Sequence, residues 1–184
     1  MKDLFTGSLV RLSADEPEVA AKAWTEWAKD SEEHRLGTST PIQVFSKSRH
    51  KDFVENHQDK NTAFRFTIHT LADDTLIGAV SLWMRTWVQG EAWLGIGIGD
   101  RNYWGKGYGT DAMRLIVGYG FNELNLRRIS LSLNDYNERA LKTYQKVGFQ
   151  VEGRVREESL RDGIYYEGIY MGVLREEWME KNET

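Results

Sequence analysis

Apolar and polar positions repeat with two different periods along the chain, and each period predicts one kind of element. Apolar residues at helical spacing predict helices over residues 16–29, 109–124 and 137–147, and Ser46 as a plausible N-cap predicts another over 46–55. Strand-like runs that alternate or end at turn residues occur at 9–13, 64–70, 75–85, 94–99, 128–133, 151–160 and 164–173. Residues 30–40 are polar, and we expect a loop there.

The last two strand-like segments are separated by Asp162-Gly163, a pair typical of a two-residue hairpin turn. The order strand, helix, strand, helix and hairpin predicts an α/β (α+β) fold with a mixed sheet. No repeat, low-complexity tract or linker interrupts the 184 residues, so we expect residues 1–184 to form a single domain.

The segment at 94–99 has an unusual face. Leucine and isoleucines at 94, 96 and 98 alternate with glycines at 95, 97 and 99, so one face of this strand is apolar and the other is bare. Glycine inside a strand weakens it, and often marks a place where another group approaches the backbone. The approaching group is either a ligand or a closely packed neighbouring element, and we favour the ligand.

Residues 103–110 join this strand to the helix at 109–124 and read Tyr-Trp-Gly-Lys-Gly-Tyr-Gly-Thr. Glycines at 105, 107 and 109 allow successive backbone N–H groups to turn inward at a helix N-terminus, which is an anion site suited to a pyrophosphate. The alternative is a glycine-rich turn without a ligand. The spacing matches neither the Gly-Lys-Ser/Thr phosphate loop nor the Gly-x-Gly-x-x-Gly dinucleotide fingerprint.

Composition narrows the class of partner. The formal net charge is −4, and lysines and arginines form no long runs, so the sequence does not support a nucleic-acid partner. The absence of cysteine excludes disulfides, metal sites with cysteine ligands and a cysteine nucleophile. We see neither a signal peptide nor a run of apolar residues long enough to span a membrane, and we expect a cytoplasmic protein without a membrane partner.

Two motifs together resemble the GNAT superfamily of N-acetyltransferases. Residues 104–110 are similar to the loop that cradles the pyrophosphate of acetyl-CoA, with Trp104 in place of the usual Gln or Arg. Residues 137–149 are similar to the family's Asn-x-x-Ala-x-x-x-Tyr-x-x-x-Gly-Phe helix. The likeness is strongest to the ribosomal-protein-alanine and spermidine acetyltransferase branch, over about residues 75 to 175. It implies a mixed sheet with a splayed strand pair, helices on both faces and a C-terminal β-hairpin.

The resemblance also implies that acetyl-CoA is the co-substrate, that no metal is needed, and which residues contact the cofactor. The pantetheine arm is expected along the splayed strand and the pyrophosphate in the loop. The implied contacts are Ile96, Gly97, Ile98, Trp104, Gly105, Lys106, Gly107, Tyr108, Gly109, Thr110, Asn137, Ala140 and Tyr144.

Acetyl transfer to an amine needs a base for the amine and a proton for the leaving thiolate. The resemblance implies that Tyr144 is the acid, although a buried core tyrosine would show the same spacing. In this branch a Glu often precedes the Leu-Gly-Ile stretch, where Trp93 stands here. Glu91 lies two residues earlier on the same side and is our candidate base, the alternative being an exposed carboxylate at a strand end. His69 in a predicted strand is a weaker candidate, because a single histidine there is more often structural.

We therefore predict an acetyl-CoA-dependent N-acetyltransferase that uses direct attack by a primary amine in a ternary complex. The alternative is a non-catalytic acetyl-CoA-binding sensor or interaction module. The acceptor is either a small-molecule amine or a protein N-terminus, and Trp83, Trp87 and Trp93 either line its pocket or pack in the core. Members of this branch are often homodimers or larger homo-oligomers, and the sequence leaves the number of subunits open.

Overall fold

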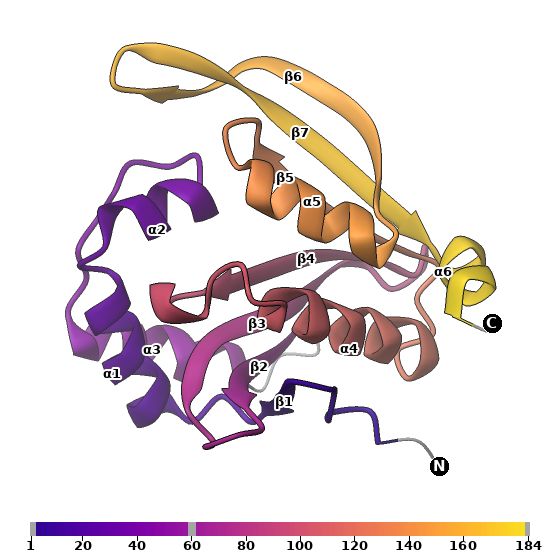
Figure 1. The fold of residues 1–184 in the computed structure, drawn as a ribbon, viewed down its shortest axis with the longest axis horizontal. Coiled ribbons are helices and arrows are strands. Elements are labelled where there is room, and N and C mark those ends of the chain that lie inside the picture. Colours follow the sequence, from indigo (N-terminus) through magenta and orange to yellow (C-terminus); the bar gives the residue numbers. More distant parts are fainter. Residues whose placement is uncertain (1–2, 59–61, 183–184) are drawn as a thin grey trace.

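The computed structural model describes residues 3–58 and 62–182. Within these residues, seven strands form one open mixed sheet in the order β1-β2-β3-β4-β5-β7-β6 (Figure 1). The strands are β1 (Val10–Ser13), β2 (Ala63–Thr70), β3 (Leu76–Thr86), β4 (Glu91–Ile98), β5 (Arg128–Asn134), β6 (Gln150–Arg161) and β7 (Ile164–Leu174). The predicted fold class is confirmed, and the Asp162-Gly163 turn joins β6 to β7.

Helices lie on both faces of the sheet. They are α1 (Pro17–Trp27), α2 (Ser31–Gly37), α3 (Lys47–Gln58), α4 (Tyr108–Asn122), α5 (Glu138–Val147) and α6 (Arg175–Asn182), with a 3-10 turn η1 (Arg101–Tyr103) before α4. The apolar face of β4 is turned toward α4, where Ile98 lies next to Gly109. The bare face is turned toward α1 and α2, since Gly99 packs against Trp27 and Gly97 against Glu33.

Strands β4 and β5 pair in parallel and separate soon after the pairing begins. Their register runs through only three positions and ends where Trp93 faces Ser130, although both strands continue. From Leu94 onward the edge of β4 that faces β5 therefore has no partner in that strand. The splayed strand pair is confirmed, and it opens between β4 and α5 (Figure 1).

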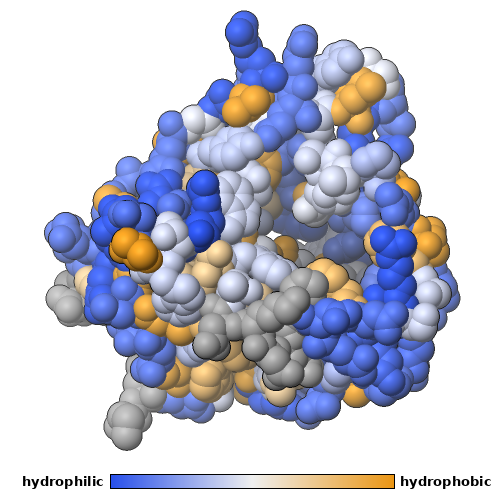
Figure 2. Space-filling model, turned by 180° about the vertical axis from the view of Figure 1, so that it is seen from behind, coloured by the Kyte–Doolittle hydropathy of each residue, from blue (hydrophilic) through white to orange (hydrophobic). Residues whose placement is uncertain are grey.

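The core that fixes this opening lies between the sheet and α4. Phe121 and Ile116 of α4 and Leu82 and Ile129 of the sheet are fully buried. Burying one such side chain contributes roughly 1.5–3 kcal/mol. No helix in the part of the chain that the structure describes is long and apolar enough to cross a membrane. The surface seen from behind is mostly hydrophilic, with apolar residues scattered over it (Figure 2).

Two helices were not predicted. Helix α6 packs through Trp178 on Phe121. Helix α2 lies in the segment that we expected to be a loop, and that expectation is wrong. Helix α2 forms because the Asp30 side chain caps its N-terminus, accepting hydrogen bonds from the backbone N–H groups of Glu32 and Glu33 at 3.0 and 3.3 Å.

Candidate active site

A cavity of about 840 Å³ occupies the opening between β4 and α5. It is lined by β4, the loop before α4, α5, α2 and the bulged part of β6, so segments distant in sequence meet around it. Of the predicted cofactor contacts, those that line it are Ile96, Gly97, Ile98, Trp104, Gly105, Gly107, Gly109, Thr110, Asn137, Ala140 and Tyr144.

The loop before α4 has the backbone shape of an anion site. Gly105 and Gly107 have φ angles of 71° and 92°, in the left-handed region that favours glycine. Gly107 is the N-cap of α4 and has no side chain to satisfy the first N–H groups of the helix. These donors and the positive end of the helix dipole therefore face the cavity, where they suit a phosphate group.

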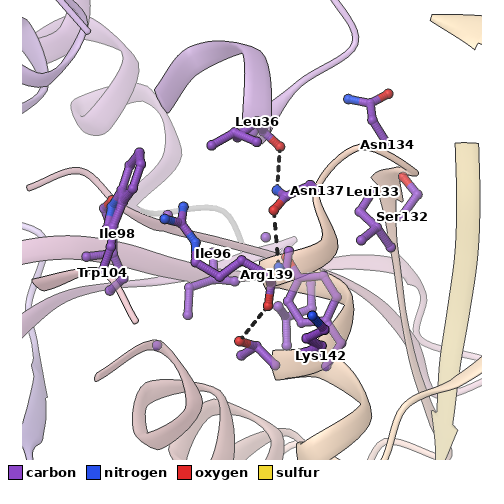
Figure 3. A pocket seen from close by; sticks show the side chains of 18 of the residues that line it. Leu36, Ile96, Ile98, Trp104, Ser132, Leu133, Asn134, Asn137, Arg139 and Lys142 are labelled. Atoms are coloured by element: carbon purple, nitrogen blue, oxygen red, sulfur yellow. Dashed lines mark hydrogen bonds between the residues drawn. The ribbon is translucent and has the colours of Figure 1, made fainter. Parts of the chain in front are cut away.

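Trp104 stands at the position of the usual Gln or Arg, and its contacts here are with the protein itself. Its indole Nε1 donates a hydrogen bond to the carbonyl oxygen of Ile98 at 2.5 Å, which ties the loop to the end of β4. The guanidinium of Arg139 in α5 lies 3.7 Å from the centre of the Trp104 ring. Arg139 thus reaches from α5 toward the β4 side of the cavity (Figure 3) and brings a cation close to the loop.

Asn137 joins two walls of the cavity. Its side chain caps α5 by accepting from the Ala140 N–H at 3.1 Å, and its amide nitrogen donates to the Leu36 carbonyl at the end of α2 at 3.0 Å (Figure 3). Both hydrogen bonds are within the chain, so the amide holds α2 against α5 as well as lining the cavity. Ala140 follows on the same helix, where its small side chain keeps the lining open.

Tyr144 lines the cavity one turn further along α5. Its hydroxyl makes no hydrogen bond with any residue in the described ranges, and its ring lies 6.2 Å from that of Phe149. Burial raises the pKa of Tyr144 to about 12, and the nearby Arg139 partly offsets this. At neutral pH the phenol is therefore protonated and able to donate.

The glycines on the bare face of β4 have two different explanations, close packing at one position and space for a ligand at the others. A side chain at Gly99 would overlap the Trp27 ring, so close packing explains that glycine. Gly95 and Gly97 line the cavity, and a Cβ built on Gly97 would lie 3.5 Å from Oε1 of Glu33. At these two positions the absent side chains leave room in the cavity.

Glu33 of α2 lines the cavity beside this strand and was missed by our reading of the sequence. Burial, followed by repulsion from Asp30, raises the pKa of Glu33 to about 7, while Arg139 acts in the opposite direction. Its carboxylate makes no hydrogen bond or ion pair with another residue of the described chain. Asp30 and Glu33 have the spacing of a capping box, the local signal that could have identified this helix.

A second carboxylate enters from the C-terminal hairpin. The register of β6 and β7 shifts between Val155 and Ser159, and this bulge directs Glu158 to the cavity. The Tyr170 hydroxyl donates a short hydrogen bond to Glu158, which raises the pKa of Tyr170. The Tyr170 ring lies 6.1 Å from that of Trp93, so Glu158 is near the closed end of the splayed pair.

Three predicted site residues lie outside the cavity lining. Lys106 is exposed in the loop, and Tyr108 packs edge-on against Tyr103 at 5.2 Å between ring centres. Glu91 begins β4, at the end where the strands are still paired. It is 3.3 Å from Arg85 and 3.7 Å from Arg128, so the structure gives Glu91 an ion-pairing role and no access to the cavity.

Of the predicted tryptophans and His69, some line the cavity and the others pack elsewhere in the protein. Trp83 and Trp93 line the cavity, whereas the Trp87 ring packs on Phe64 at 6.0 Å. His69 is hydrogen-bonded at both ring nitrogens, to Asp74 and Thr67, and lies away from the cavity. The residues that the structure describes include no group of three metal-ligating side chains.

Comparisons with known proteins agree with this geometry. Residues 9–150 match the family model described as an acetyltransferase (GNAT) domain. An uncharacterized N-acetyltransferase of Bacillus licheniformis is 28% identical over 183 residues, covering 97% of this chain and 99% of the relative. A spermidine N(1)-acetyltransferase of Escherichia coli (strain K12) is 37% identical over 82 residues, 45% of this chain and 44% of the relative.

A solved structure shares the fold over nearly the whole chain. It is the spermidine N-acetyltransferase from Vibrio cholerae in complex with CoA and spermine. It superposes with a TM-score of 0.82 at 24% identity, covering 92% of this chain and 98% of that chain.

Proposed function

This chain belongs to the GNAT acetyltransferase family, and on that basis we propose that it acetylates the primary amine of a small cationic acceptor by direct attack in a ternary complex. The family determines the reaction, acetyl-CoA-dependent transfer to an amine. The acceptor class and the roles of individual residues are our proposal.

The cofactor wall fits acetyl-CoA, and we define it as the lining residues Trp104, Gly105, Gly107, Gly109, Thr110, Asn137, Ala140 and Tyr144. Its backbone donors suit the pyrophosphate, and Arg139 adds a cation beside them. The unpaired edge of β4 at Ile96 and Ile98 offers backbone groups to the amide-rich pantetheine arm. When bound, acetyl-CoA supplies an acyl group activated as a thioester.

Tyr144 is the general acid in this proposal. As the amine nitrogen forms its bond to the carbonyl carbon, the carbon–sulfur bond breaks and the sulfur needs a proton. The Tyr144 hydroxyl has no partner among the described residues and lines the same cavity, and its raised pKa of about 12 keeps it protonated. The non-catalytic sensor alternative gives this free phenol no task.

The proposed acceptor class is supported by four residues that line the cavity, Glu33, Glu158, Trp83 and Trp93, which we call the acceptor wall. It places two carboxylates and two aromatic rings on one cavity. Carboxylates and aromatic faces both attract cationic amines. The relatives named for spermidine acetylation favour the same class.

The test is CoA release from acetyl-CoA with three acceptors: spermidine, a monoamine of similar length, and a peptide with a free N-terminus. We expect the highest kcat/KM with spermidine and the lowest with the peptide. A preference for the peptide would overturn the acceptor class and favour a protein N-terminus. CoA binding without turnover of any amine would favour the sensor alternative.

A further inference from the structure

The attacking amine must lose a proton, and family membership does not say where the proton goes in this chain. An alkyl ammonium group has a pKa near 10.4, so only about one molecule in 2,500 is neutral at pH 7. A base beside the amine removes this limitation. The carboxylates that line the cavity within the described chain are Glu33, Glu138 and Glu158.

Two of these carboxylates are already engaged. Glu138 is largely exposed and lies 3.4 Å from Nζ of Lys142 on the same helix. Glu158 is exposed and accepts the hydrogen bond from Tyr170. Each of these carboxylates therefore already has a partner for its charge within the chain.

Glu33 differs from both in burial and in position. It is half-buried, and no residue in the described ranges stabilises its charge through a hydrogen bond or an ion pair. It lies over Gly97 on the bare face of β4. The cavity is lined both by this part of β4 and by Glu33, so an amine bound beside the strand lies near the carboxylate.

We propose that Glu33 is the general base that takes the proton from the attacking amine, directly or through one water molecule. The inference rests on the proposed acetyl transfer to amines. The ammonium first gives one proton to Glu33, which releases it to solvent. The neutral nitrogen then bonds to the carbonyl carbon, its second proton passes to Glu33, the carbon–sulfur bond breaks, and Tyr144 gives its proton to the sulfur. The products are the acetamide and CoA with one net proton released, and proton exchange with solvent restores the Glu33 carboxylate and the Tyr144 phenol.

The electrostatic surroundings suit this role. Asp30, at the start of α2, disfavours the Glu33 carboxylate, while Arg101 pairs with Asp30 and limits that effect. Arg139 from α5 stabilises the carboxylate, and its charge acts on Tyr144 as well. The other charged groups lining the cavity are Glu138, Lys142 and Lys146 from α5 and Glu158 from β6. With a pKa of about 7, Glu33 is both deprotonated often enough and basic enough to act near neutral pH.

The experiment compares wild type, Glu33→Gln and Glu33→Asp in kcat against pH with spermidine. We expect the wild-type rate to rise with a midpoint of about 7. We expect Glu33→Gln to lose about 100-fold at pH 7 and to lack this midpoint, its rate rising toward the pKa of the amine itself. Glu33→Asp is expected to keep the midpoint at a lower rate. The control is Glu32→Gln, one residue away, where the carboxylate pairs with Arg101 outside the cavity.

A weakly basic amine, already neutral at pH 7, separates a base from a structural residue. With it, Glu33→Gln is expected to lose much less than with spermidine, whereas general damage to the site would lower both rates equally. An unchanged pH profile in Glu33→Gln, or equal losses with both amines, would overturn the inference. Absence of turnover in wild type would instead overturn the proposed function, so the two failures are distinguishable.

Thermal unfolding verifies that the variant is folded. The folded-state pKa of Glu33 lies above its ordinary value of 4.5, so this group lowers the stability of the fold as the pH rises from about 4.5 to about 7, and the loss is complete above that pH. Glu33→Gln is therefore expected to gain in Tm relative to wild type at pH 8 and to show no such gain at pH 4. A loss of Tm at both pH values would mean that its lost activity reflects damage to the fold, and the inference would fail.

Discussion

The cofactor wall and the acceptor wall enclose one cavity but are built in different ways. The cofactor wall comes from two short stretches of chain, the loop before α4 and the helix α5 with its cap Asn137. The acceptor wall is assembled from α2, β3, β4 and a bulge in β6. In the proposed assignment, the phosphate is recognised by groups that are local in sequence, whereas the acceptor is recognised by residues that only tertiary contacts bring together.

If the walls are independent, changes in one should alter acetyl-CoA kinetics and changes in the other should alter acceptor kinetics. Tyr144, the proposed acid, should show the largest effect. We expect Tyr144→Phe to lower kcat by about 100-fold with little change in either KM, because only proton donation to the leaving sulfur is lost. The matched control is Tyr119→Phe, a partly buried tyrosine that packs on Phe66 away from the cavity. Equal losses in both variants would contradict the acid role.

A change in the phosphate loop should affect acetyl-CoA alone. Gly107 has a φ of 92°, and a Cβ there would also lie 3.3 Å from Leu9. Such strain costs on the order of 1–3 kcal/mol, and in the free variant the loop can relieve it by leaving the shape that binds CoA. Gly107→Ala should therefore raise the Kd for CoA by about tenfold in calorimetry and leave the KM for the amine unchanged. Gly153→Ala, where the new methyl group meets open space, is the control. An unaltered Kd would remove the loop from the cofactor wall.

The acceptor wall is tested by a substitution at Glu158. We expect Glu158→Gln to raise the KM for spermidine a few-fold and to leave the KM for acetyl-CoA unchanged, since an exposed ion pair contributes only about 0.2–1 kcal/mol. Glu157→Gln, on the same bulge and outside the cavity lining, is the control. An equal rise with a monoamine would show that Glu158 does not recognise a second positive charge.

The smallest catalytic effect is expected at Glu91, which belongs to neither wall. Its contacts with Arg85, Arg128 and Ser130 are those of a structural ion pair. We expect Glu91→Gln to lower the free energy of unfolding by about 1 kcal/mol in urea titrations, with kcat and both KM values unchanged. A loss of kcat at unchanged stability would restore Glu91 as a candidate base.

The two walls also differ in how far the sequence alone could predict them. The glycine loop and the Asn137 helix are short-range patterns, and the structure brings both to the cavity as expected. Glu33 was missed because α2 has no apolar stripe and begins through the polar cap at Asp30. Glu158 reaches the cavity only through a register shift, which no local pattern announces.

Glu91 shows what the alternation of residues along a strand cannot predict. The period of two gives the side of the strand on which a residue lies. It does not say where along β4 the neighbouring strand departs, and that point, between Trp93 and Leu94, decides which residues reach the cavity. The fold class followed from element order, whereas the proposed base could be found only from the geometry of the opening.

The most direct test of the account is an initial-rate study in which acetyl-CoA and spermidine are both varied. Both walls face one cavity, so we predict CoA release with intersecting reciprocal plots, as expected when both substrates are bound before transfer. Parallel plots would indicate an acetylated enzyme intermediate and contradict direct attack. No turnover at any concentration, with CoA bound, would contradict the assignment of the acceptor wall.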